Sequence, residues 1–178
     1  MLLLPYLEEK TTYAAYNFNE PWNGFNNRKL AERIPKVYVF HGFESPGNTT
    51  TNYLAVVGDE TVWSRTRKVG WKDIKDGTSN TISIVENRGA NVHWMEPRDL
   101  SLSDMDLKVD SPNGISSPYT DPAVLMAGGS LQRLHQSLRP EVLRVMFTIA
   151  GGEKVEHDGA NGWQLLDDGR KRLLKETP

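Results

Sequence analysis

The chain has 178 residues, no cysteine and a formal net charge of -2, and this length is typical of one domain. The absence of cysteine excludes disulfides and thiolate metal sites. Because both charge signs are interspersed, no basic field exists and we expect no nucleic-acid partner. The apolar start at residues 1–4 is broken by Pro5. It is too short for a membrane span or a signal peptide, so we expect no membrane insertion and no export signal in the chain as written.

The first 40 residues predict two short helices and one strand. Apolar side chains recur at spacings of three and four over residues 5–16, which indicates an amphipathic helix. A second helix is predicted over residues 27–33, ended by Pro35. The aromatic run at residues 37–40 is typical of a short buried strand.

The stretch at residues 75–86 combines a tight turn with a strand. Glycine accepts positive φ, and the preceding aspartate can bond the backbone beyond it, so the turn follows from these two residue types. The β-branched residues that follow predict a strand over residues 81–85. We interpret the stretch as a structural corner. The motif consists of Asp76, Gly77, Thr78, Ser79, Asn80 and Thr81.

The rest of the chain predicts further short strands and one helix. Strands are expected over residues 52–58 and 92–95. Gly128-Gly129 centres a predicted hairpin over residues 123–134, because these glycines permit the primed two-residue turns. A proline and a glutamate begin the helix expected over residues 139–149.

Residues 98–122 lack a clear period and predict a long loop, of the kind that is usually functional or mobile. We expect this loop after Pro97 to be the display surface. The whole pattern predicts an α+β domain over residues 1–156, built on an antiparallel sheet of short strands with an N-terminal helix and a helix near residues 140–149. A polar C-terminal tail is expected at residues 157–178.

Several short sequence motifs, from about residue 2 to about residue 155, resemble motifs of the planctomycete DUF1559 family of unknown function. They occur in the same order as in that family. These motifs lie at residues 2–8, 20–23, 26–30, 51–58, 74–86, 94–100 and 126–130. Family members usually begin with a pilin-like methylation motif and a hydrophobic helix. The resemblance therefore implies a pilin-like or pseudopilin-like globular domain, an extracytoplasmic or cell-surface location and a protein partner.

The chain departs from this family at three places. It lacks the pilin-like segment, so only the globular part is similar. Residues 40–43 stand where the family has a Cys-Pro-Ser motif. Gly128 replaces the aspartate of the family's hairpin. A site that depended on that aspartate is not expected here.

Two groups of residues are candidates for ligand binding. Asp104, Asp106 and Asp110 bring oxygen ligands into one loop, as calcium sites do, although a solvated acidic loop is the alternative. Trp63, Trp71 and Trp94 could stack on sugars, or they could anchor loops on the core.

The sequence contains no recognisable catalytic arrangement. The four histidines are dispersed, no nucleophile elbow surrounds Ser130, and nothing places Glu86 beside Glu96. We therefore expect no enzyme and no cofactor, calcium being the one candidate. The expected function is a structural or interaction domain, with a carbohydrate- or calcium-binding module as the alternative.

Overall fold

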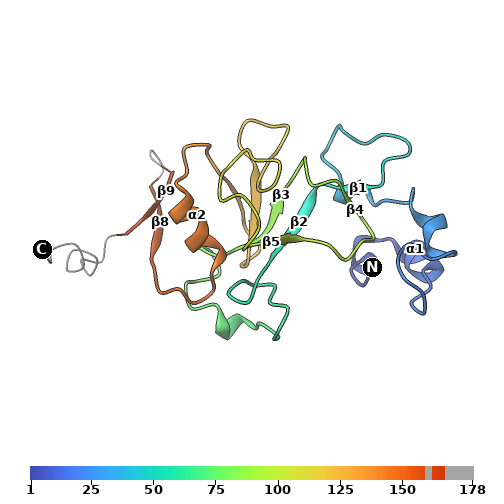
Figure 1. Ribbon diagram of the computed structural model, residues 1–178, viewed down its shortest axis with the longest axis horizontal. Coiled ribbons are helices and arrows are strands. Elements are labelled where there is room, and N and C mark those ends of the chain that lie inside the picture. The colour runs from blue at the N-terminus through green and yellow to red at the C-terminus, as the bar shows by residue number, and fades with distance from the viewer. Residues whose placement is uncertain (159–161, 167–178) are drawn as a thin grey trace, which may run out of the picture.

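The computed structural model describes residues 1–158 and 162–166. Its centre is a five-stranded sheet in the order β5-β2-β3-β6-β7; β2, β3 and β5 are labelled in Figure 1. All neighbouring strands are antiparallel except β2 and β5, which are parallel. The sheet is formed by β2 (Tyr53–Val57), β3 (Ile82–Glu86), β5 (Leu100–Ser101), β6 (Ala123–Met126) and β7 (Leu131–Arg133). The predicted α+β class is confirmed.

One face of this sheet is buried under the helix α2 (Pro140–Phe147). Side chains alternate between the two faces of a strand, so Leu54, Val56, Val85 and Val124 point to the same side and are buried together. The helix begins with a proline at a position that needs no backbone donor. It buries Val142, Leu143, Met146 and Phe147 in this main core. The helix near residues 140–149 is confirmed.

The hairpin β6-β7 is confirmed, but its turn differs from the expected two-residue form. The Met126 N–H donates to Ser130 O at 2.9 Å, and the Gly129 N–H donates to Met126 O at 2.9 Å. Gly129 has φ 89°. The loop is therefore a three-residue one whose last residue is left-handed, a form that glycine adopts without a Cβ clash.

The N-terminal region folds differently from its prediction. One helix over residues 5–16 is wrong because Glu8, with φ 63°, separates η1 (Leu4–Leu7) from α1 (Lys10–Ala15). The second predicted helix is reduced to a single turn, η2 (Asn27–Leu30). This region forms a second core of Leu4, Leu30, Trp94 and Met95. None of the helices in the described residues is long and apolar enough to cross a membrane.

The strand predicted over residues 37–40 is also wrong. The backbone N–H groups of Tyr38 and Val39 bond locally, to Pro35 and Lys36, and form η3 (Lys36–Tyr38). A small separate sheet pairs β1 (Thr50–Thr51) with β4 (Val92–His93). The predicted strands near β2, β3 and β4 are confirmed, with β4 shorter than expected.

Part of the loop predicted over residues 98–122 is a strand or lies in the core; its role as a display surface stays a prediction. It contains β5, and its side chains Leu102, Met105, Val109 and Ile115 are buried in the main core. Another turn of helix, η4 (Trp71–Asp73), lies in the connection before β3.

The start of the expected tail forms a hairpin. β8 (Val155–Asp158) pairs with β9 (Gly162–Leu165), so the strand crosses the expected boundary at residue 156. Val155 is buried, and Trp163 and Leu165 contact the main core. These apolar side chains anchor the hairpin beside α2 (Figure 1). Residues 167–178 lie outside the described residues.

Candidate interaction surface

The face of the sheet opposite α2 carries an apolar row across four strands. The strand register aligns Ala55 with Ile84, Ile84 with Leu125, and Leu125 with Leu131. We call this side of the sheet the outer face and these four residues the apolar row. The first three side chains are half-buried, and Leu131 is 71% exposed on the edge strand β7. The outer face therefore carries an apolar strip that becomes exposed at the edge strand.

Four aromatic rings lie beside one end of the apolar row, and we call them the aromatic cluster. They are Phe40, Phe43, Tyr53 and Tyr119. Phe40 is buried and meets the other three rings edge to face, at centroid distances of 5.8 to 6.3 Å. Phe43 is 54% exposed and Tyr119 is 39% exposed. The cluster therefore has a buried base and an open rim.

Glu86 lies at the base of this cluster, opposite Tyr53 in the strand register. The Glu86 side chain is buried, and its Oε2 accepts the backbone N–H of Ala123 at 2.8 Å. Burial, with the nearby carboxyl of Glu86 as a second cause and Tyr119 as a third, raises the pKa of Tyr53. The outer face thus combines apolar, aromatic and acidic groups within one area.

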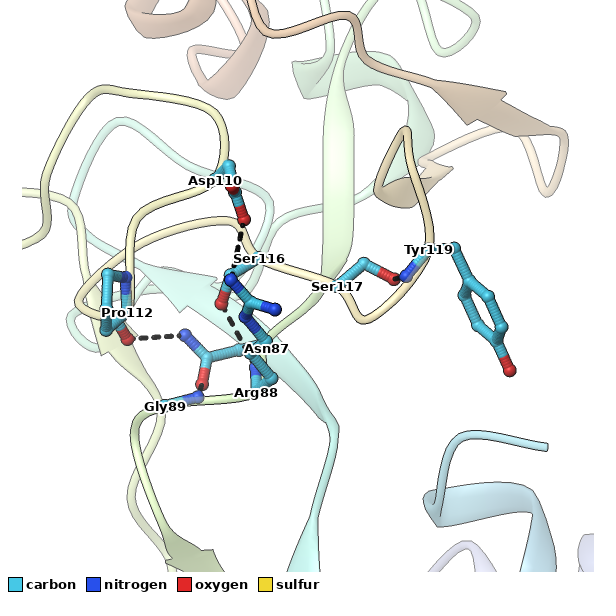
Figure 2. Close-up of polar contacts among 8 residues, drawn as sticks. All are labelled: Asn87, Arg88, Gly89, Asp110, Pro112, Ser116, Ser117 and Tyr119. Atoms are coloured by element: carbon cyan, nitrogen blue, oxygen red, sulfur yellow. Dashed lines mark hydrogen bonds and ion pairs between the residues drawn. The ribbon is translucent and has the colours of Figure 1, made fainter. Parts of the chain in front are cut away.

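The loop that carries Tyr119 is fixed to the end of β3 by the buried side chain of Asn87 (Figure 2). Its Nδ2 donates to Pro112 O at 3.0 Å and to Gly114 O at 2.7 Å. Its Oδ1 accepts the backbone N–H groups of Gly89 and Ala90 at 2.9 and 2.7 Å. All four hydrogen-bonding capacities of the amide are used, which explains why an asparagine is buried here.

Further bonds extend this attachment towards Tyr119. The Arg88 backbone N–H donates to Ser116 Oγ at 3.1 Å, and its guanidinium pairs with Asp110 at 3.2 Å. Ser117 Oγ accepts the N–H of Tyr119, whose side chain reaches away from the loop (Figure 2). The Tyr119 hydroxyl then donates to the backbone carbonyl of His41 at 2.7 Å. The ring is therefore held at both ends.

The corner motif at residues 76–81 lies elsewhere, against the end of α2. The Asp76 carboxylate accepts the N–H groups of Gly151 and Gly152 at 2.8 and 3.0 Å. Gly77 has φ 95°, and Thr81 Oγ1 donates to Gly77 O. Asn80 Nδ2 donates to Asp76 O, and Thr78 O accepts the N–H of Gly128. Ser79 has no hydrogen bond through its side chain among the described residues.

The three tryptophans proposed for sugar stacking are not brought together. The Trp63 indole N–H donates to Ser83 O at 2.9 Å, which anchors its loop on β3. Trp71 is 69% exposed on η4. Trp94 is buried in the N-terminal core, where its N–H donates to Ala31 O at 2.7 Å. Trp94 is only 8% exposed and therefore offers little surface for stacking on a sugar.

The three aspartates proposed for calcium also take separate partners. Asp104 accepts the Ser103 hydroxyl, Asp106 accepts the Ser111 hydroxyl, and Asp110 pairs with Arg88. Within residues 1–158 and 162–166, no group of three or more acidic or histidine side chains could hold a metal ion. The structure therefore does not gather Asp104, Asp106 and Asp110 into one site.

A second feature was not foreseen from the sequence. A cavity of about 690 Å³ lies between β7, the start of α2 and the β8-β9 hairpin. It brings together His135 and His157, which are far apart in the chain, with Arg133, Arg139 and Trp163. His157 lies at this cavity because β8 pairs with β9. The sequence predicted a tail from residue 157 onward and therefore gave no sign of the cavity.

No family model, curated protein or solved structure matches this chain. The resemblance to DUF1559 proteins therefore stays a prediction from the sequence.

Proposed function

We propose that this chain is a non-enzymatic structural or interaction domain, similar to the globular part of pilin-like surface proteins, and that its outer face binds a protein partner. The observation that carries this proposal is the apolar row. Its members come from four strands and continue to Leu131, which is 71% exposed. The extracytoplasmic location rests on the family resemblance and belongs to the same proposal.

The geometry of the outer face supports a partner of protein class. Small ligands usually occupy concave pockets, whereas protein interfaces place aromatic and aliphatic side chains at the centre of a broad patch. The apolar row and the aromatic cluster fit the second description. Tyr119 and Phe43 supply the large, partly exposed rings that often dominate binding energy.

Photo-crosslinking in the native cell tests this proposal. A benzophenone amino acid is placed at position 131, on the outer face, and in a matched chain at position 6, where Tyr6 is 84% exposed on η1. We expect a discrete protein adduct from position 131 only. Adducts from position 6 alone, or no adduct from position 131, would contradict the outer face as the binding surface.

The 690 Å³ cavity favours a second candidate, a binding module for a polar ligand such as a carbohydrate. This volume is within the usual range for ligand pockets, and Trp163 supplies an aromatic wall. A glycan array tests this candidate, with Arg139→Gln, just before α2, as the variant that should lose binding and Arg144→Gln, on α2, as the control. Absence of any bound glycan would remove it.

A further inference from the structure

Glu86 is a nearly buried acid, 6% exposed, with little to stabilise its charge. A buried carboxylate normally gains hydrogen bonds or a cationic partner, because loss of water is costly for a charged group. Glu86 Oε2 accepts one backbone N–H, that of Ala123. Its Oε1 accepts no hydrogen bond in the described part of the chain.

This second oxygen remains in contact with solvent. In the described part of the chain, the Trp163 indole nitrogen is the one fully enclosed polar side-chain atom without a hydrogen-bond partner. Glu86 Oε1 also lacks a partner, so it is not fully enclosed.

Two basic side chains from neighbouring segments are directed elsewhere. Arg133 pairs with Ala123 in the strand register, but its guanidinium donates to the backbone carbonyl of Asp121 at 2.7 Å. The imidazole of His41 is fully exposed and lies beside a different carboxylate. Among the described residues, no lysine, arginine or histidine forms an ion pair with Glu86. The Glu86 carboxyl group therefore has no ion-pair partner among the described residues.

Tyr53 connects this carboxylate to the aromatic cluster. Tyr53 is opposite Glu86 on the neighbouring strand, and its ring lies 5.8 Å from that of Phe40. Tyr119 and Phe43 form the exposed rim, with their centroids 6.2 Å apart. Aromatic faces carry negative potential and attract ammonium and guanidinium groups. Rings near an acid are therefore complementary to a cation.

We propose that the aromatic cluster and Glu86 form a receptor for one lysine or arginine side chain of the protein partner. The alkyl stem of that side chain packs against the exposed surface of Tyr119 and Phe43, and its charged end bonds Glu86 Oε1. This inference rests on the proposed function for the origin of the basic side chain. The chemistry of the receptor does not depend on which partner supplies it.

Small probes test the receptor without the partner. N-acetyl-lysine methylamide is titrated into the ¹⁵N-labelled chain, with N-acetyl-norleucine methylamide as the uncharged probe of nearly equal shape. The amide signal of Ala123 reports binding directly, because its N–H donates to Glu86. We expect the lysine probe to shift this signal and to bind at least about tenfold more tightly than norleucine, since the cation adds ion-pair and cation–π attraction.

Two variants locate the effect. Glu86→Gln keeps an acceptor for Ala123 and removes the charge, and Glu60→Gln removes the same charge from an exposed pair with Arg144. Binding should be lost in Glu86→Gln and retained in Glu60→Gln. Phe43→Ala, at an exposed rim position, should weaken binding severalfold and provides a test even if Glu86→Gln fails to fold.

Equal binding of the two probes would overturn the proposal, as would unchanged lysine binding in Glu86→Gln or no shift of Ala123. Such a failure leaves the crosslinking result at position 131 unaffected, so the receptor and the proposed function can fail separately. Binding of the lysine probe that is lost in Glu86→Gln and retained in Glu60→Gln would support the receptor.

Discussion

Replacement of Asn87 by alanine should strongly destabilise the protein, because Asn87 holds the loop that carries Tyr119 at the end of β3. The substitution removes four hydrogen bonds, two to Pro112 and Gly114 and two from Gly89 and Ala90. Each such bond contributes about 1 kcal/mol net, so the expected loss is roughly 4 kcal/mol. For a domain of this size that corresponds to a fall in Tm of roughly 8–16 °C.

Asn113→Ala is the matched control, because it changes the same residue type within the loop that Asn87 holds. Asn113 makes one exposed bond, from Nδ2 to Asp104 O at 3.0 Å, and its loss should cost less than about 1 kcal/mol. Urea denaturation of both variants, followed by tryptophan fluorescence, measures the difference in unfolding free energy. Equal stability of the two variants would refute the role assigned to Asn87.

Three further predictions concern stability measured by thermal and urea denaturation. Gly89→Ala should lower the unfolding free energy by about 1–3 kcal/mol, because the added Cβ would overlap the neighbouring loop. Gly70→Ala, where a Cβ has room, should be nearly neutral. Equal losses of stability in the two variants would contradict this. Burial raises the pKa of Asp99, so the folded state favours the protonated form and loses stability as pH rises through that pKa. Asp99→Asn should therefore be stabilising at neutral pH and lose this advantage in acid; a gain that persists in acid would be inconsistent with this cause. Trp163→Phe removes an enclosed indole N–H that has no hydrogen-bond partner, whereas Trp94→Phe breaks a hydrogen bond of 2.7 Å. Trp163→Phe should therefore lower the unfolding free energy by about 1–3 kcal/mol less than Trp94→Phe. A larger loss for Trp163→Phe would contradict this difference between the two indole groups.

Local patterns in the sequence were sufficient to predict the central strands and α2. The β-branched run before Glu86 and the Pro-Glu start of α2 each specify an element through neighbouring residues. Where propensity and tertiary packing agree, such predictions succeed.

The failures share a physical cause, because they depend on contacts between distant parts of the chain. Residues 37–40 are as apolar as a strand, but Phe40 donates its N–H to the Asn52 side chain and packs in the aromatic cluster instead of joining a sheet. β5 is only two residues long and pairs in parallel with β2, which no local period reveals. The sequence around β8 is polar and did not indicate a hairpin, but Trp163 of that hairpin packs against the main core.

The candidate interaction surface was even less predictable than the fold. The apolar row exists only because the register aligns single residues from four strands. Glu86 was noticed in the sequence as a possible partner of Glu96, whereas the structure pairs Glu96 with Arg98 and places Glu86 beside Tyr53. No spacing in the sequence indicates these neighbours.

The affinity of the crosslinked partner for surface variants tests the central claim most directly. The partner's Kd is measured for the unmodified chain, for Leu131→Asp on the outer face and for Tyr6→Asp, which introduces the same charge on the N-terminal region. A charge within a buried apolar contact should weaken binding at least about tenfold. The proposed function predicts this loss for Leu131→Asp and an unchanged Kd for Tyr6→Asp. An unchanged Kd for Leu131→Asp would contradict the outer face as the binding surface.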